Sequence, residues 1–459
     1  MRRENEFRYL KLANILREQI HSGFIKPGEF LLSEHELCKH YGMSRSSVRK
    51  SLDQLLLEKL IIKKVGQGTI VSPDFVVEAS PNKVLRIFAT SPSHFYDICM
   101  PHVIDAFQKN NPGVEVKCMS FSAGDFWDSI NTSIDLGLKP DLILLSDRQF
   151  YEVEDLEQYS DLQDKLGGSQ EGIYPSLWKS FSDSGRLKAL PVTFSTVYLA
   201  YNPELFQRHG VTEPSPFWTQ DDFLEAAEQL TMDLNGDGIN DVYGFSLASS
   251  LSRWPVIALQ NGVNFKEVDS TEPILNTLEF IHDLLYKRRS AFLTPRNALN
   301  SEAFTREKAA MVLTTSIELA GWRHQTMPFT PKIAPLPFGK QKQTMLIANV
   351  LMLPKNSEEP ELARAFLETA VNPEVQQQLS ATTGFISVRK AINEATWSQL
   401  GLESLQIYDN SIEKSHFLHE IFEDASLVDE LETEMTLFWT GMESAAEVTD
   451  RVKLILSRS

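Results

Sequence analysis

The sequence is poor in cysteine and has no long apolar run. Its 459 residues contain three cysteines, Cys38, Cys99 and Cys118. An odd and sparse set provides neither a disulfide framework nor the spacing of a metal site, and it is typical of a reducing compartment. No stretch reaches the roughly 20 apolar residues that span a membrane, and no apolar core follows Arg2 and Arg3 as in a secretory signal. We therefore expect a cytoplasmic protein without membrane contact.

Catalytic signatures are missing as well. The sequence has no GxSxG elbow, no HExxH pair, and no glycine-rich phosphate loop of the Walker or Rossmann type. Its 10 histidines are scattered, and no pair among its 62 acidic residues stands out as a catalytic pair. These absences predict that the protein is not an enzyme and carries no organic cofactor.

Charge is distributed unevenly along the chain. The whole sequence has a formal net charge of −18, which by itself argues against a nucleic-acid partner. Residues 1–75, however, hold 13 Lys and Arg against 9 Asp and Glu, so their net charge is +4 and that of the rest is −22. A basic segment joined to an acidic body is the asymmetry expected when only one end of a chain meets DNA.

The stretch 33–71 predicts two short helices, a turn and a two-stranded ribbon. Ser33 and Glu36 match a capping box at the start of the first helix, and Gly42 suits the turn that ends it. Ser44 is placed to cap the second helix, whose start carries polar and basic residues. A short helix, a glycine turn and a second helix of this kind form the unit that enters the DNA major groove.

This stretch resembles the winged helix-turn-helix of GntR-type regulators. The matching pieces, at the family's spacing, are Pro27-Gly28, Leu31, Ser33-Glu34, Leu37, Gly42, Ser44-Arg45, Val48-Arg49, Leu52 and Gly66-Gln67-Gly68-Thr69. Leu32 stands where the family usually has proline, and His35 stands where many members have a DNA-contacting arginine. The resemblance implies a double-stranded DNA operator as partner. Together with the basic residues of the helix and wing, it predicts DNA contacts by Ser33, His35, Ser44, Arg45, Ser46, Ser47, Arg49, Lys50, Lys63, Lys64, Gly66, Gly68 and Thr69. For Lys63 and Lys64, a solvated strand edge is the alternative.

The remaining chain predicts a second module. We place the DNA-binding domain at 1–72 (α+β), a proline-containing linker at 73–82, and a ligand-sensing domain at 83–459. Strands expected at 84–89, 114–118 and 142–145 alternate with helices at 101–110 and 125–136. Such alternation indicates βαβ units and a parallel sheet.

The second module resembles the large sugar-binding class of extracellular solute-binding proteins, which includes maltose-binding protein. The resemblance rests on the order of several short motifs: Asn111-Pro112-Gly113-Val114, Pro140-Asp141-Leu142, Leu190-Pro191, Tyr201-Asn202-Pro203, Gly321-Trp322 and Ala334-Pro335-Leu336-Pro337. It implies two α/β lobes with a ligand cleft between them and crossings near 194–202 and 335–347. The predicted fold is therefore multidomain, a winged helix followed by a two-lobed α/β periplasmic-binding-protein-like fold.

A carbohydrate site needs aromatic faces and polar groups for hydroxyls. Trp322 follows an expected strand, where the resembling family often has a stacking tryptophan, and Trp254 follows a serine-rich loop; both line the cleft or lie in the core. Trp127 and Trp178 fall in or near helices, where a buried tryptophan is commoner. Loops after parallel strands add further candidates. The predicted ligand residues are Ser91, Phe95, Asp147, Ser195, Thr196, Trp254, Trp322 and Arg323; a surface ion pair is the alternative for Arg323.

One loop resembles a calcium-binding loop. Asp233, Asn235, Asp237, Ile239 and Asp241 occupy ligand positions 1, 3, 5, 7 and 9 of an EF-hand loop, with Gly238 at the sixth. The twelfth position is Gly244 instead of the bidentate glutamate. The loop either binds calcium or is a turn in which Asp and Asn side chains bond the backbone.

Together these features predict a ligand-responsive transcription regulator that binds DNA as a homodimer. A small molecule, most simply a mono- or oligosaccharide, would close the lobes and alter the spacing of two recognition helices. The alternative is a cytoplasmic or anchored solute-binding component of a sugar transport system.

Overall fold

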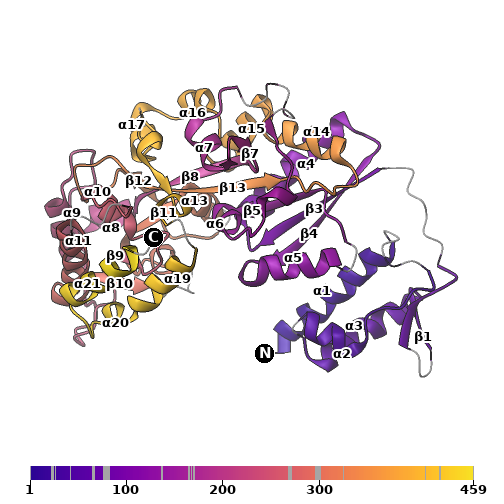
Figure 1. Ribbon diagram of the computed structural model, residues 1–459. Helices are drawn as coiled ribbons and strands as arrows, with labels where there is room; N and C mark the ends of the chain where they lie inside the picture. The colour runs from indigo at the N-terminus through magenta and orange to yellow at the C-terminus, as the bar shows by residue number, and fades with distance from the viewer. Residues whose placement is uncertain are drawn as a thin grey trace. The chain divides into compact units, whose positions relative to one another are not determined.

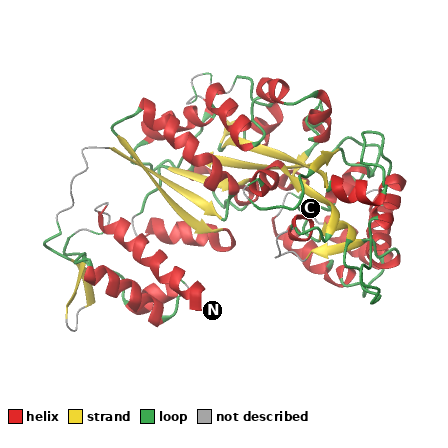
Figure 2. Ribbon diagram, turned by 180° about the vertical axis from the view of Figure 1, so that it is seen from behind, coloured by secondary structure: helices red, strands yellow, loops and turns green. Residues whose placement is uncertain are grey.

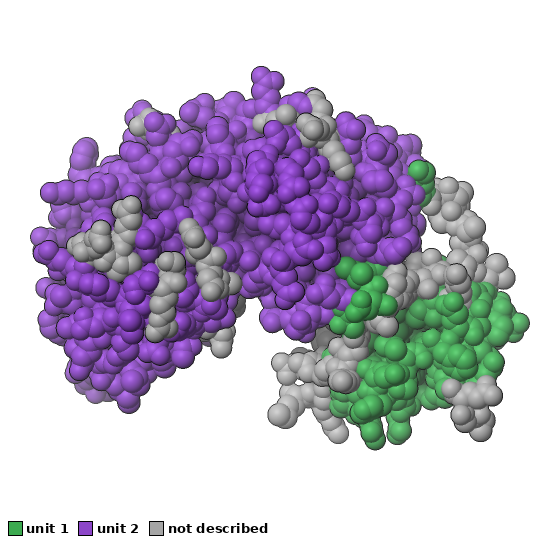
Figure 3. Space-filling model, viewed as in Figure 1, with its two compact units in different colours: residues 1–83, 132–138 green, residues 84–131, 139–459 purple. Residues whose placement is uncertain are grey.

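The computed structural model describes residues 2–457 except 22–24, 26, 42, 65–67, 76–82, 136–137, 164–165, 167, 169–170, 267–270, 295–300, 324, 409 and 423–424. The chain forms two compact units, which are coloured separately in Figure 3. One comprises residues 1–83 with 132–138, and the other comprises 84–131 with 139–459. We call them the winged-helix unit and the solute-binding unit. Most of the predicted linker lies outside the described residues.

Residues 1–83 of the winged-helix unit form three helices and a ribbon among the described residues. They are α1 (Arg2–His21), α2 (Glu34–His40), α3 (Arg45–Leu57), β1 (Ile61–Lys64) and β2 (Gly68–Val71) (Figure 1). The apolar stripes of the helices meet in one core with the ribbon, since Leu16, Leu37, Leu52 and Val71 are all buried there. This packing fixes α2 and α3 against α1 and leaves their polar faces exposed.

The ribbon is antiparallel, and its register pairs Ile61 with Val71 and Lys64 with Gly68. The segment before α2 joins it, because the amide of Gly28 donates to the carbonyl of Val71 at 3.0 Å. Gly28 has a φ of +87°, which glycine adopts without steric cost, so the Pro27-Gly28 turn is correctly placed to bring this segment beside the wing.

The solute-binding unit is built on one ten-stranded sheet with helices against both faces (Figure 2). The main strand order is β10-β9-β11-β8-β13-β5-β3-β4. The strands are β3 (Lys83–Ser91), β4 (Val114–Ser122), β5 (Leu142–Ser146), β8 (Leu190–Tyr201), β9 (Tyr243–Ala248), β10 (Ala291–Thr294), β11 (Ala309–Thr315), β12 (Lys332–Ala334), β13 (Met345–Met352) and β14 (His416–Phe417); β6 (Ser182–Asp183) and β7 (Arg186–Leu187) form a separate hairpin.

Helices cover the two halves of this sheet. Those between β3 and β9 are α4 (Met100–Asn110), α5 (Phe126–Asp135), α6 (Asp147–Tyr151), α7 (Pro175–Ser180), α8 (Pro203–His209) and α9 (Gln220–Gln229). Those between β9 and β13 are α10 (Pro255–Gln260), α11 (Glu272–His282), α12 (Glu302–Thr305) and α13 (Ser316–Trp322). After β13 follow α14 (Pro360–Ala370), α15 (Pro373–Thr383), α16 (Lys390–Thr396), α17 (Gln399–Ser404), α18 (Leu418–Ile421), α19 (Ala425–Glu434), α20 (Thr436–Trp439) and α21 (Ala445–Leu456).

The expected parallel sheet is only partly correct. β3 with β5, and β9 with β10 and β11, are parallel, as βαβ units require. The central strands β8 and β13 instead run antiparallel to each other and to β11 and β5, respectively. These central strands carry the chain between the two halves, which we call lobe 1 (β3, β4 and β5) and lobe 2 (β9, β10 and β11).

The long strand β8 crosses from lobe to lobe. Its residues up to Thr196 pair with β13, and those from Val197 onward pair with β11. The chain returns through 335–345 into β13 and crosses a third time through 405–422. This third crossing was not predicted, because no motif distinguishes it in the sequence.

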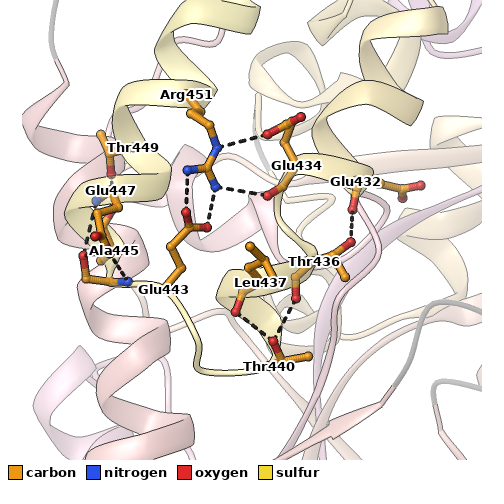
Figure 4. A network of polar contacts seen from close by, with 11 residues as sticks. Glu432, Glu434, Thr436, Leu437, Thr440, Glu443, Ala445, Glu447, Thr449 and Arg451 are labelled. Atoms are coloured by element: carbon orange, nitrogen blue, oxygen red, sulfur yellow. Dashed lines mark hydrogen bonds and ion pairs between the residues drawn. The ribbon is translucent and has the colours of Figure 1, made fainter.

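The third crossing ends in helices that pack on lobe 2. Buried side chains of α19 and α21, such as Leu431 and Val452, join the same core as Phe245 and Leu278. Figure 4 shows that Arg451 of α21 links this helix to the end of α19. Its Nε donates to Oε2 of Glu434 at 3.0 Å, and its guanidinium also pairs with Glu443. Among the described residues, none of the helices has the length and apolar character that a bilayer crossing requires.

Candidate functional site

The start of α3 presents the first candidate site. Ser44 caps the helix by accepting the amide of Ser47 at 3.3 Å, and its hydroxyl also lies 3.0 Å from that of Ser47. Ser47 is buried, so it supports the cap, whereas Arg45, Ser46 and Lys50 are exposed. The local fold therefore turns two cations and one hydroxyl toward solvent at the end of the helix that enters a groove in helix-turn-helix proteins.

Arg49, one turn further along α3, is oriented by α2. Its Nε donates to Oε2 of Glu34 at 2.7 Å, and this bond raises the pKa of the arginine. The Arg49 side chain is exposed, and this bond uses only its Nε, so it leaves the two terminal nitrogens as further donors. On the other side of the helix, the ammonium of Lys50 lies 5.7 Å from the ring centroid of Tyr9, a cation–π distance.

The other predicted DNA contacts lie on α2 and the ribbon. Ser33 forms the predicted capping box with Glu36, and His35 is exposed one residue into α2. On the ribbon, Lys63, Lys64 and Gly68 are exposed and Thr69 is half-buried, with the Lys63 ammonium 3.4 Å from Asp53. Gly66 lies outside the described residues. DNA contact by these residues stays a prediction.

The second candidate site is a cavity of about 800 Å³ in the solute-binding unit, which we call the cleft cavity. Lobe 1 lines it with the loop after β3, including Pro92 and His94, and with the start of α5. The central strand β13 contributes Ala348 and Asn349, and lobe 2 contributes Ser250 and Ile317. A molecule in this cavity would touch both lobes.

Trp127 is the largest aromatic side chain on the wall. Its indole N–H donates to the carbonyl of Gln149 at 2.8 Å, and its ring lies edge-on to Phe126 with centroids 5.3 Å apart. The amide of Gln149 is fixed in turn by Thr90, because Nε2 donates to Oγ1 at 2.9 Å. These contacts hold a half-buried aromatic face beside amide groups, as recognition of hydroxyl-rich ligands requires.

The charged groups on the wall are mostly acidic. Asp125, Asp128 and Glu152 line the cavity together with one arginine, Arg148. Nε of Arg148 lies 3.4 Å from Glu152, and its terminal nitrogen lies 3.8 Å from Asp429. The cation is thus balanced by carboxylates, and the wall favours uncharged ligands over anionic ones.

The structure reverses the expectation for the tryptophans. Trp322 packs in the core of lobe 2 against Phe304 and Phe329, and its indole N–H donates to Ser301 at 3.1 Å. Trp254 is buried as well, with its ring 6.0 Å from that of Trp439. Trp127, expected in the core, lies on the cavity wall. Whether a helix turns an aromatic side chain inward or into a cleft depends on the neighbouring elements, which local sequence does not specify.

Other predicted ligand residues lie in the inter-lobe hydrogen-bond network. Ser195 accepts the amide of Ser316 at 2.7 Å, and Thr196 donates to the carbonyl of Leu405. Both residues are fully buried at the point where β8 crosses between the lobes. None of the eight predicted ligand residues is among the described residues that line the cavity.

Three of the remaining predictions lie one or two residues from the wall. Ser91 falls between Thr90 and Pro92, which line the cavity. Phe95 follows His94 but points into lobe 1, where it meets Phe385 at 5.8 Å. These residues therefore lie in loops next to the cavity wall, and their contact with a ligand stays a prediction.

Asp147, also adjacent to the wall, is 6% exposed. One carboxylate oxygen accepts the amide of Ala348 on β13 at 2.9 Å. Burial raises the pKa of Asp147 to about 7, although this hydrogen bond and the nearby cations of Arg148 and Arg253 act in the opposite direction. The carboxyl group therefore links lobe 1 to the central strand.

Two glycines mark close approaches between the lobes. A Cβ placed on Gly321 of α13 would lie 2.5 Å from Cε1 of His94, and one on Gly384 would lie 2.6 Å from the guanidinium carbon of Arg323. A larger residue at either position would require the side chain of His94 or Arg323 to move. Arg323, predicted to bind ligand, is instead placed at this inter-lobe contact.

The calcium-like loop satisfies its carboxylates internally. Asp233 accepts the amides of Gly236 and Gly238, each at 2.7 Å, which lowers its pKa. Asp241 accepts the amide of Leu234 at 2.9 Å. Within the described part of the chain, no three His, Cys, Asp or Glu side chains are grouped to hold a metal ion. The geometry is that of the hydrogen-bonded turn, and calcium binding by Asp233, Asn235, Asp237, Ile239 and Asp241 stays a prediction.

Known proteins resemble the two units separately. Residues 8–71 match the family of bacterial regulatory proteins described as gntR, and residues 102–401 match the bacterial extracellular solute-binding protein family. Neither is a family of enzymes. Over 97 residues the chain is 33% identical to the arabinose metabolism transcriptional repressor of Geobacillus stearothermophilus, covering 21% of this chain and 26% of the repressor.

A second regulator and two solved structures extend this picture. The mannosyl-D-glycerate transport/metabolism repressor of Escherichia coli is 38% identical over 68 residues, covering 15% of this chain and 28% of the repressor. The chain therefore spans about a quarter of the length of these curated relatives. An ABC substrate-binding protein of Listeria monocytogenes in complex with cycloalternan has a TM-score of 0.69 at 19% identity, covering 82% of this chain and 98% of that one.

A solute-binding protein of Thermotoga lettingae bound with α-D-tagatose has a TM-score of 0.68 at 18% identity, covering 82% of this chain and 100% of that one. At these identities the structures establish the fold alone. The family match covers well over half of the chain, and the fold places the cavity between two lobes as in a binding protein. The chain belongs to the bacterial extracellular solute-binding protein family and carries a domain of the gntR family of regulatory proteins at residues 8–71.

Proposed function

We propose that this protein is a DNA-binding transcription regulator whose solute-binding unit senses a carbohydrate. The observation that carries the proposal is the presence, in one chain, of a gntR-type helix with exposed cations at its start and a two-lobed unit with a cleft cavity. The proposal includes a cytoplasmic homodimer, since one helix-turn-helix buries too little surface for a specific operator.

The ligand class follows from the wall of the cleft cavity. Trp127 provides an aromatic face, and Asn349 provides an amide group for hydroxyls. The balanced charge of Arg148 disfavours acidic ligands. Three names of similar proteins agree with a neutral carbohydrate, because one repressor concerns arabinose and two similar structures hold cycloalternan and tagatose.

Lobe closure would connect the two units. A ligand that contacts both lobes only in the closed state stabilises that state by its extra contacts. In a dimer, closure would change the separation of the two α3 helices, and half-sites about one helical turn apart are sensitive to that separation. Ser91 remains a proposed ligand contact because both of its neighbours line the wall.

Two measurements test the proposal. Duplexes selected from a random pool by the purified full chain provide the DNA probe, and a thermal-shift panel of neutral, acidic and amino carbohydrates provides the ligand. We expect retention of specific duplexes, stabilisation by a neutral carbohydrate, and a change in DNA affinity when that carbohydrate is added. Failure to enrich any duplex would overturn the regulator and favour a transport component.

The Trp127→Ala variant tests whether Trp127 contacts the carbohydrate. We expect it to weaken carbohydrate binding by about fivefold, since a stacking contact contributes about 1 kcal/mol, and to leave DNA binding of the free protein unchanged. Trp178→Ala, which changes a half-buried tryptophan of lobe 1 outside the cavity wall, is the matched control. Equal losses in both variants would contradict the assignment of Trp127.

A further inference from the structure

A second cavity lies on the segments that connect the lobes. This hinge cavity has a volume of about 330 Å³ and shares no described lining residue with the cleft cavity. Pro335 and Lys342, on its wall, belong to the second crossing, and Gln406 and Lys414 belong to the third. A ligand here would bridge two crossings without touching the cleft.

Hydrogen bonds connect these crossings to the point where β8 passes between the lobes. The hydroxyl of Thr196 donates to the carbonyl of Leu405, next to Gln406, and the hydroxyl of Thr344 donates to the carbonyl of Val197 at 2.6 Å. The amide of Thr344 also donates to the hydroxyl of Ser415 at 3.2 Å. Rotation of the lobes must reorient these segments, so the shape of the hinge cavity depends on the lobe angle.

The wall combines two exposed lysines with neutral polar groups. Lys342 and Lys414 are exposed, and neither forms an ion pair with any residue that the structure describes. The single carboxylate on the described wall, Glu403, already accepts Nε2 of Gln399 at 3.2 Å. Asn410 and Ser411 add amide and hydroxyl groups. In a chain of net charge −18, two exposed lysines on one small cavity form a local site for negative charge.

The rigidity and size of the cavity narrow the ligand class. Pro216 and Pro335 have fixed φ angles, and Gln406, 5% exposed, is held in the left-handed region at a φ of +57°. A volume near the lower end of the ~300–1,000 Å³ of ligand pockets suits a small molecule. Ammonium groups bind oxyanions through charge-assisted hydrogen bonds.

We propose that the hinge cavity binds a small multivalent oxyanion, carrying phosphate or several carboxylates, and that its occupancy favours one lobe angle. The anion is then a second input to the solute-binding unit, separate from the ligand of the cleft. The binding step does not depend on the proposed regulator function, because it involves neither DNA nor carbohydrate.

The first test measures anion binding by the full chain. Inorganic phosphate and citrate are titrated separately at constant ionic strength, by calorimetry and thermal shift, against wild type and the Lys342→Gln/Lys414→Gln variant. We expect one of them to bind wild type and to lose about tenfold or more in affinity in the variant, as expected for two close charges. Lys340→Gln, which removes an exposed neighbouring lysine outside the wall, should bind as wild type does.

The melting temperature without anion reports whether each variant is folded, so a loss of binding is not mistaken for unfolding. Absence of binding by wild type, or equal affinity in the double variant, would overturn the site. If only phosphate affinity is lost in the double variant, the site binds a phosphate ligand. If only citrate affinity is lost, the site binds a polycarboxylate.

Hydrogen exchange tests the coupling. The amide of His416 donates to the carbonyl of Thr344 at 3.2 Å, so its protection reports on the joined crossings. We expect the bound anion to slow exchange in segments 344–349 and 415–417 in wild type and not in the double variant. Unchanged exchange with the anion bound would leave a binding site but overturn control of the lobe angle. A negative carbohydrate screen would affect the proposed function alone.

Discussion

The start of α3 and the wall of the cleft cavity are suited to opposite partners. α3 exposes Arg45, Arg49 and Lys50 on a convex surface, whereas the wall holds three carboxylates against one arginine in a concave one. Exposed cations attract a polyanion over a distance of about 10 Å at moderate salt. A wall with an aromatic face, whose arginine is already paired with carboxylates, selects by shape and hydrogen bonding instead. The difference teaches that the net charge of the chain says little about either partner.

The two surfaces also differ in how their side chains are held. At α3, one ion pair to Glu34 orients Arg49, Lys50 has only a cation–π contact with Tyr9, and the Arg45 side chain is exposed. At the cleft, Trp127 is fixed by a hydrogen bond and two aromatic neighbours. Adaptable cations suit a backbone of repeating phosphates, and a fixed ring suits one ligand pose.

The largest expected effect tests whether the two units are energetically separate. Trp322→Ala removes a buried indole and its hydrogen bond to Ser301, so we expect the solute-binding unit to lose about 3–5 kcal/mol of unfolding free energy. Chemical denaturation followed by circular dichroism measures the loss. At temperatures where the unit remains folded, DNA affinity should not change. A matching fall in DNA affinity would show that the winged-helix unit and the solute-binding unit form one cooperative unit.

The next effect concerns the cations of α3. Arg45→Ala with Arg49→Ala should weaken binding to a selected duplex by about 100-fold, since each contact to a phosphate or base edge contributes about 1–3 kcal/mol. Fluorescence anisotropy at fixed salt measures it. Arg306→Ala, which removes an exposed cation of lobe 2, is the control and should bind as wild type does. Unchanged affinity in the double variant would remove α3 as the DNA-reading surface.

A smaller effect concerns pH and lobe 1. Because burial raises the pKa of Asp147 to about 7 in the folded chain, above the ~3.9 of the unfolded one, the native state binds the extra proton between these values. This extra proton on Asp147 stabilises the folded state fully below about pH 4, and the stabilisation is lost as the pH rises through about 7. Asp147→Asn keeps an oxygen for the amide of Ala348 and should flatten this dependence, with a gain of about 2 kcal/mol at pH 8. Denaturation curves between pH 5 and 8 are the measurement, and a variant with the wild-type slope would contradict it.

The smallest effect concerns the 233–241 loop. Asp233→Ala removes the acceptor of two backbone amides, so we expect a slight fall in melting temperature that is the same in EDTA and in calcium. Asp221→Ala, at an exposed helix position, is the control. Stabilisation of wild type by calcium that is lost in Asp233→Ala would instead assign a metal site.

Local sequence signals predicted the winged-helix unit in detail. Ser33, Ser44 and the Pro27-Gly28 turn act over a few residues, so their caps and turn form as expected. Because a surface helix has one apolar stripe, the exposed face of α3 followed from Val48, Leu52 and Leu55. Ten of the twelve described residues predicted to contact DNA are exposed.

In the solute-binding unit the same reasoning selected loops next to the cleft cavity but none of the described residues on its wall. Six of its eight predicted ligand residues are buried. Trp322 and Trp254 lack any local signal for direction, because residues far away in the chain, such as Phe304 and Trp439, fill the space beside them. Trp127 was detectable only as an aromatic residue near the start of a helix.

The sequence by itself determined the two families, the order of the units, the caps of α2 and α3, and the strands that carry the cleft loops. These features depend on short-range hydrogen bonds and on apolar periodicity, both of which involve residues close together in the sequence. Only the tertiary structure decided which tryptophan faces the cleft, that the central strands run antiparallel, and that a third crossing helps to form a hinge cavity. Those features depend on contacts between residues hundreds of positions apart, such as Thr196 with Leu405, whose pairing no local pattern encodes.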